Sequence, residues 1–184
     1  MSELKQVMRA RRSVKQISER AIDRSLVEEM LELAAFAPFH SKVEPWHVYL
    51  IQDAEQKEKL VRAVAAAKND GASLGQVKEM LERKFLTAPV ILMVTSAVFQ
   101  DAKKDFESVA ATSAFIQNLQ LAAWESGIGT IWRTPKFLFQ PAFREALQIG
   151  EEETVMGLLP LTLLPEEKPD PKPRRELKDF FHEL

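Results

Sequence analysis

The apolar and polar positions along the 184-residue chain repeat with two periods, and these periods predict its helices and strands. Apolar residues three and four positions apart predict helices over 4–12, 23–37, 54–68, 73–85, 105–126 and 141–148. Runs rich in aromatic and β-branched residues predict strands over 46–52, 89–95, 129–132 and 155–164. Because the order shows no regular strand–helix–strand repeat, we expect an α+β fold of three layers, α/β/α, around one sheet.

The longest predicted helix, 105–126, carries apolar side chains around most of its circumference. Such a helix must be buried on several sides. In a chain of this size, it lies either at the centre of the fold or at a subunit interface. Gly127 follows it directly and is expected to cap its carboxyl end.

The chain is expected to form a single domain, 1–184, because domains typically hold about 100–200 residues. Its last part, 165–184, begins with a segment rich in proline and charge and is expected to be a C-terminal extension crossing a surface. The pattern alone does not say whose surface this is.

Composition excludes several classes of protein. With no cysteine there is no disulfide framework, zinc knuckle or cysteine nucleophile. The 25 basic and 27 acidic residues are mixed along the chain, so no basic face for nucleic acid is expected. We find no apolar run of the roughly 20 residues that a membrane helix needs, and no signal-peptide pattern at the start. We therefore expect a cytoplasmic protein without nucleic-acid or membrane partners.

A cluster of cations lies at the end of the first predicted helix. Arg11, Arg12, Ser13 and Lys15 combine guanidinium groups, which match phosphate oxygens, with a hydroxyl donor. The cluster is either an anion site or the solvated basic end of a helix. A second basic pair, Arg174 and Arg175, is either part of such a site or a surface tail.

Two further segments have a functional and a structural interpretation. The restrained loop 38–47, with His40 and Lys42, either frames a ligand or connects a helix to a strand whose Trp46 is core. The glycines of 127–134 either allow a flat ligand to approach the backbone or make a cap and turn. A third glycine is missing, which excludes a Rossmann fingerprint. No metal-ligand spacing or nucleophile motif is present, so an enzyme of this sequence needs a bound cofactor.

Together and in this order, these segments resemble the nitroreductase family. Residues 11–15 resemble its opening RRSxR signature, and 37–48 its AP…QPW-x-F element. Residues 87–90 are similar to the AP that starts its next strand, 127–132 to its GlGxxW, and 173–177 to its C-terminal KPR-x-PL. The match spans nearly the whole chain and is strongest to the small bacterial NAD(P)H nitroreductases.

The resemblance implies a mixed, mostly antiparallel sheet and a domain-swapped homodimer, with 165–184 packed on the partner subunit and FMN bound non-covalently at the interface. NAD(P)H would give a hydride to FMN N5, and a nitroaromatic, quinone or related electrophile would take the electrons. No side chain is expected to be catalytic. The residues implied to hold FMN are Arg11, Arg12, Ser13, Lys15, Phe36, His40, Lys42, Trp132, Arg133, Thr134 and Arg174. His40 and its loop would come from the other subunit.

The chain departs from the family pattern in this loop and just before it. Lys42 stands where the family has asparagine, Glu44 where it has glutamine, and Phe36 where close relatives have arginine. Two alternatives therefore remain beside the reductase: a non-catalytic protein that stores FMN or senses redox state, and a different flavin reaction on the same scaffold.

Overall fold

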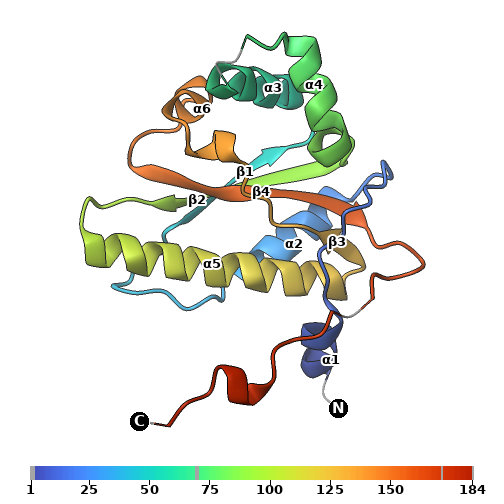
Figure 1. The fold of residues 1–184 in the computed structure, drawn as a ribbon, viewed down its shortest axis with the longest axis vertical. Coiled ribbons are helices and arrows are strands. Elements are labelled where there is room, and N and C mark those ends of the chain that lie inside the picture. The colour runs from blue at the N-terminus through green and yellow to red at the C-terminus, as the bar shows by residue number, and fades with distance from the viewer. Residues whose placement is uncertain (1–2, 69–70, 171, 184) are drawn as a thin grey trace.

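One sheet divides the molecule into two helical layers (Figure 1). The structure is a computed structural model and describes residues 3–68, 71–170 and 172–183. The strands are β1 (Trp46–Ile51), β2 (Val90–Ala97), β3 (Ile128–Thr130) and β4 (Glu153–Leu163), in the order β1-β2-β4-β3. All three pairings between them are antiparallel.

The inner strand β2 is buried along almost its whole length, as the apolar run over 89–95 predicts. Its side chains alternate between the two layers. Ile91 and Met93 join the cluster on one face, whereas Val90, Leu92 and Val94 join the cluster on the other. Both layers are therefore built on the same strand, and the α/β/α architecture is confirmed.

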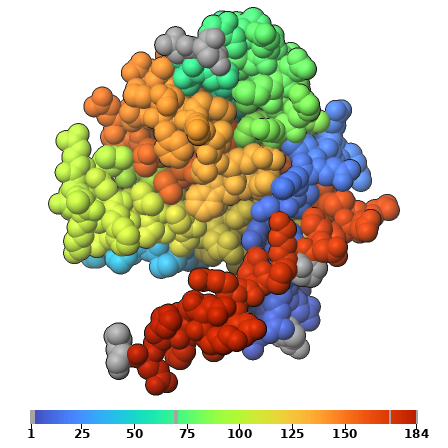
Figure 2. Space-filling view, in the orientation of Figure 1, coloured from blue at the N-terminus to red at the C-terminus, as the bar shows by residue number. Residues whose placement is uncertain are grey.

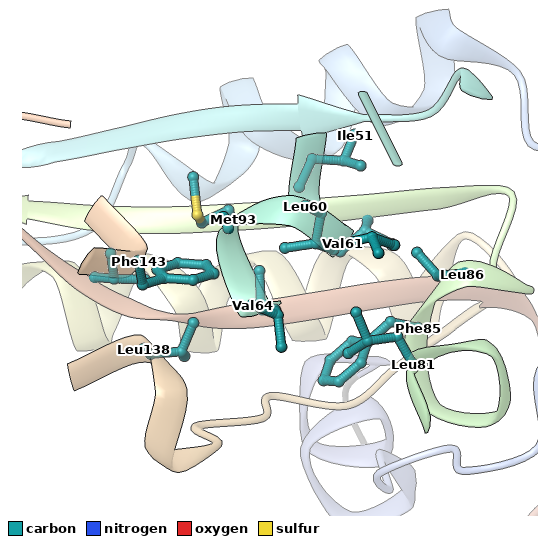
Figure 3. Close-up of a cluster of buried hydrophobic side chains, with 14 of the residues drawn as sticks. Ile51, Leu60, Val61, Val64, Leu81, Phe85, Leu86, Met93, Leu138 and Phe143 are labelled. Atoms are coloured by element: carbon teal, nitrogen blue, oxygen red, sulfur yellow. The ribbon is translucent and has the colours of Figure 1, made fainter. Parts of the chain in front are cut away.

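The first layer contains α3 (Ala54–Lys68), α4 (Leu74–Leu81) and α6 (Pro141–Ala146). Figure 3 shows its core, in which Leu60, Val61 and Val64 of α3 lie between Phe143 and Leu138 on one side and Leu81 and Phe85 on the other. The second layer contains α2 (Arg24–Ala34) and α5 (Ala102–Glu125), packed on the opposite face (Figure 1).

The structure differs from the predicted elements at their ends. The helix expected over 73–85 ends at Leu81 and continues as a π-helix, Glu82–Leu86. Helix α5 begins earlier than predicted, because the Asp101 side chain caps it by accepting from the backbone N–H of Lys104. A 3₁₀-helix, Lys136–Phe139, occupies a stretch for which no element is predicted.

Two segments at opposite ends of the chain project from the body on the side of α5 (Figures 1 and 2). One is α1 (Glu3–Ala10), which has no buried residue. The other is the C-terminal segment, which carries a short 3₁₀-helix, Leu177–Asp179. Within the described part of the chain, no helix has the length and apolarity needed to cross a membrane.

Candidate functional site

A cleft of about 690 Å³ lies where the N-terminal segment meets the C-terminal extension. Residues 11–16 form one wall. The other wall is formed by residues of the C-terminal extension: Pro165, Glu167, Lys168, Pro169, Asp170, Lys172 and Arg174. Six basic side chains line it, against two acidic ones, Glu167 and Asp170. The basic ones are Arg11, Arg12, Lys15, Lys168, Lys172 and Arg174. The lining of the cleft therefore carries an excess of positive charge.

The N-terminal wall is held in place by pairing with the edge strand β3. Ser13 forms a parallel bridge with Thr130, and the Val14 N–H donates to the Thr130 carbonyl at 3.0 Å. This isolated parallel bridge lies outside the four strands, whose own pairings are all antiparallel. Val14 is buried, whereas Ser13 and Lys15, on either side of it, are exposed. Alternation along the paired segment thus leaves Ser13 and Lys15 free to face a ligand.

Gly129 makes this pairing possible. A Cβ at this position would lie 2.7 Å from Val14 Cγ2, which is closer than real side chains approach. Gly127 has a φ of 76°, a left-handed conformation that favours glycine, directly after α5. The two glycines therefore serve the turn and the packing of Val14, which is the structural interpretation of the motif.

The charges in the cleft act on one another. Burial lowers the pKa of Arg11, and the nearby charges of Arg12 and Arg174 lower it further. Arg12 joins both walls, since its side chain donates to the Arg11 carbonyl at 2.6 Å and to the Asp170 carbonyl at 3.4 Å. Cations from opposite ends of the chain are thus held together at the cost of mutual repulsion, which an anion would relieve.

The segment Trp132–Thr134 continues the same sheet edge beyond Thr130. Trp132 Nε1 donates to the Met156 carbonyl at 2.8 Å, and its ring lies where a side chain at Gly157 would be. Arg133 exchanges two backbone hydrogen bonds with Leu158. Its guanidinium Cζ lies 5.8 Å from the centre of the Phe85 ring. The sequence did not predict this contact, which depends on the π-helix.

Arg133 is unusual among the described residues. Its Nε is buried and has no hydrogen-bond partner, and burial lowers the pKa of its guanidinium. Buried polar atoms are rarely left unpaired, so such an atom needs an explanation. Because Nε is a hydrogen-bond donor, its missing partner must be an acceptor atom. A carbonyl oxygen or a ring nitrogen of a ligand bound beside Arg133 would be such a partner.

The structure brings only some of the predicted residues together within one chain. Five of them line the cleft: Arg11, Arg12, Ser13, Lys15 and Arg174. Trp132, Arg133 and Thr134 do not line it. Lys168 and Lys172, which the sequence analysis missed, do so, and their signal was the lysine content of the proline-rich extension.

The loop residues lie elsewhere in the chain. His40 lines a separate pocket of about 190 Å³ beside Lys104 and Glu107 of α5. Phe36 is 86% exposed, and Lys42 is exposed in a left-handed conformation with φ 57°. Trp46, where the loop ends, stacks on Phe115 with ring centres 5.0 Å apart and is partly buried against the core. Within one chain, the loop acts as a connector.

Known proteins are similar to this chain in both sequence and fold. A model of the Nitroreductase family matches residues 8–161. "Putative NAD(P)H nitroreductase YfhC" of Bacillus subtilis is 30% identical, with 100% of this chain and 95% of that protein covered. The crystal structure of a nitroreductase-like family protein from Bacillus cereus superposes with a TM-score of 0.91 at 29% identity, covering 100% of this chain and 97% of that one.

A more distant structure shares the fold. It is that of a protein from Desulfovibrio desulfuricans, named a putative nitroreductase and solved in complex with FMN. Its TM-score is 0.76 at 20% identity, and 100% of this chain and 98% of that one are covered.

Proposed function

Because the chain belongs to the Nitroreductase family, we propose that it is an FMN-dependent oxidoreductase that uses NAD(P)H to reduce small electrophilic acceptors. The observation that carries the proposal is the convergence of Arg11, Arg12 and Arg174 on one cleft. Guanidinium groups match the oxygens of a phosphate, and FMN ends in one. The phosphate would offset the repulsion among these cations.

Five more of the predicted residues would contact the rest of the cofactor. Lys15 and Ser13 follow Arg12 along the wall of the cleft, and Trp132–Thr134 continue the same sheet edge. The unpaired Nε of Arg133 suits an acceptor atom of a flavin ring. Positive charge beside the ring stabilises the anionic reduced form.

The chain's own residues would bind and orient, and bound FMN would carry two electrons between donor and acceptor. NAD(P)H loses two electrons and one proton. A nitro group takes up two electrons and two protons, one of them from solvent, and becomes a nitroso group and water. Binding both reactants at one site supplies most of what such a reaction needs from the protein.

We further propose that two copies of the chain form the site. Helix α1 has eight residues and buries none of them, and a helix this short is marginal in water by itself. Apolar side chains are exposed on α1, on the C-terminal segment and on α5, where Phe106 is 74% exposed. A second copy would cover these surfaces, receive the 165–184 extension and contribute Phe36, His40 and Lys42 to the flavin.

The test of the function begins with the purified protein, which we expect to be yellow and to release FMN on heating. Anaerobic mixing with NADH or NADPH should bleach the oxidised-flavin absorbance, and an added acceptor should restore it. A protein that binds no FMN would contradict the proposal. A flavin that stays oxidised for minutes with both donors would identify a storage or sensor protein instead.

The residue that carries the proposal is tested by Arg11→Ala. Loss of a charged hydrogen bond costs about 1.5–3 kcal/mol, so the FMN dissociation constant should rise roughly ten- to a hundredfold. The matched control is Arg62→Ala, because Arg62 is an exposed arginine paired with Glu58 on α3. FMN fluorescence quenching measures both variants, and equal affinities would remove Arg11 from the site.

A further inference from the structure

Thr162 is a polar residue buried near the end of β4, in a stretch of the strand that is otherwise apolar. Its side chain is only 1% exposed, and its hydroxyl accepts a hydrogen bond from the Ser18 N–H at 2.7 Å. A buried hydroxyl costs free energy unless it is paired. The bond to Ser18 is therefore what makes a threonine acceptable at this position.

This hydrogen bond joins the bases of the two walls of the cleft. Ser18 lies two residues after Gln16, where the N-terminal wall ends. Thr162 lies three residues before Pro165, where the C-terminal wall begins. The two partners are 144 positions apart in the chain, so no local structure would bring them together. Both walls therefore start from one fixed point.

Backbone hydrogen bonds hold the surroundings of this point. The Val14 N–H donates to the Thr130 carbonyl at 3.0 Å, and the Leu164 N–H donates to the Gly127 carbonyl at 2.9 Å. Between Val14 and α2 the chain forms neither helix nor strand. The bond from Ser18 thus gives this segment a support that regular structure does not supply.

The walls carry cations that repel one another. Arg11 and Arg12 belong to one wall and Arg174 to the other. Away from the base, the Arg12 side chain donates to the Asp170 carbonyl at 3.4 Å, a longer and more exposed contact than the one at the base. Guanidinium groups can share one phosphate only in a well-defined arrangement. A fixed base limits how far repulsion can move the two walls apart.

We infer that Thr162 is a positioning residue for the cofactor, whose hydroxyl holds the two walls at the spacing at which their arginines reach one phosphate. The inference rests on the proposed function. Thr162 does not line the cleft, so it would act through Ser18 and not by touching FMN. It would thereby determine how strongly the cleft prefers FMN to riboflavin, which has the same ring and ribityl chain but no phosphate.

The test compares Thr162→Val, which has nearly the same shape but no hydroxyl, with Thr162→Ser, which keeps the hydroxyl. Fluorescence quenching gives the dissociation constants of FMN and riboflavin. Thr162→Val should weaken FMN about two- to tenfold, as the loss of one hydrogen bond allows, and weaken riboflavin much less. Thr162→Ser should restore the affinity for FMN. Thr112→Val is the matched control, because Thr112 is also buried and its hydroxyl donates to Ser96 at 3.0 Å, between α5 and β2.

Amide exchange measured by NMR tests the hydrogen bond itself without any flavin. The Ser18 N–H should exchange at least about tenfold faster in Thr162→Val than in the unmodified protein or Thr162→Ser. Equal exchange in all three proteins would overturn the inference. An equal loss of affinity for FMN and riboflavin, or an effect no larger than that of Thr112→Val, would also overturn it. An unmodified protein that binds neither flavin would contradict the proposed function together with the inference, whereas FMN binding that Thr162→Val leaves unchanged would contradict the inference alone.

Discussion

Arg11 and Arg133 are both cations whose position is unfavourable without a ligand. Burial lowers the pKa of each, and for Arg11 two neighbouring arginines add to the effect. A charge is costly to bury unless it is paired. The structure therefore places two guanidinium groups where an anion or an acceptor atom would compensate for their burial. This separates them from exposed arginines such as Arg62, which is already paired on the surface of α3.

Tyr49 permits a pH-dependent test, because it is the only tyrosine of the chain. The pKa of Tyr49 is raised to about 12. The largest cause is burial, and the second is the hydrogen bond that its hydroxyl donates to Glu153 at 2.9 Å. Since the ordinary value is about 10, the neutral form stabilises the fold below pH 10, and this contribution is lost as the pH rises towards 12. Absorbance of tyrosinate near 295 nm should therefore show a midpoint near 12 in the folded protein and near 10 in urea.

The variant Glu153→Gln separates the two causes. It should lower the midpoint, because the charge of Glu153 is removed, but leave it above 10, because Tyr49 stays partly buried. Tyr49→Phe should abolish the signal and serves as the blank. A tyrosinate midpoint near 10 in the unmodified protein, with its circular dichroism still native, would show that the Tyr49–Glu153 pair does not form.

At the level of elements, the sequence predicts best what depends on periodicity. Strand β2 and helix α5 are recognisable because each is apolar on more than one face, and both are central. The π-helix is not predictable in this way, because its wide turn depends on how Phe85 packs against α3 and Arg133. The pairing of Ser13 with β3 is also absent from the local pattern, because the two partners are far apart in the chain.

That pairing is tested by Gly129→Ala. The added Cβ would meet Val14 on a rigid wall, so overpacking should cost about 1–3 kcal/mol and displace the segment that carries Ser13 and Lys15. We expect a lower melting temperature and weaker FMN binding. Gly75→Ala is the control, since a Cβ there would meet only Ser73 Oγ at 3.9 Å, and alanine favours the helix. If the two variants melt alike, Val14 is not packed on β3.

For the whole molecule, the three-layer architecture follows from the order and period of the elements, whereas the site does not. Charge spacing alone leaves Arg11 and Arg12 as either an anion site or a solvated helix end. Only the resemblance over the whole chain predicts that Arg174 joins them, and the structure places all three at one cleft. His40 and Lys42 remain outside that cleft in a single chain, so the role proposed for them requires the proposed dimer.

The assembly is tested through the C-terminal segment, whose Phe180 and Phe181 are 53% and 61% exposed. Burying a phenylalanine contributes roughly 1.5–3 kcal/mol, and in a symmetric dimer each residue is buried twice. Phe180→Ser/Phe181→Ser should therefore weaken dimerisation about a thousandfold or more, and also weaken FMN binding, although no cation is changed.

Phe139→Ser is the control, because Phe139 is 67% exposed on the opposite layer. Sedimentation velocity should give a dimer for the unmodified protein and this control, and a monomer for the double variant. An unmodified protein that is monomeric with FMN bound would show that one copy completes the site, and the exposed phenylalanines would then need another explanation.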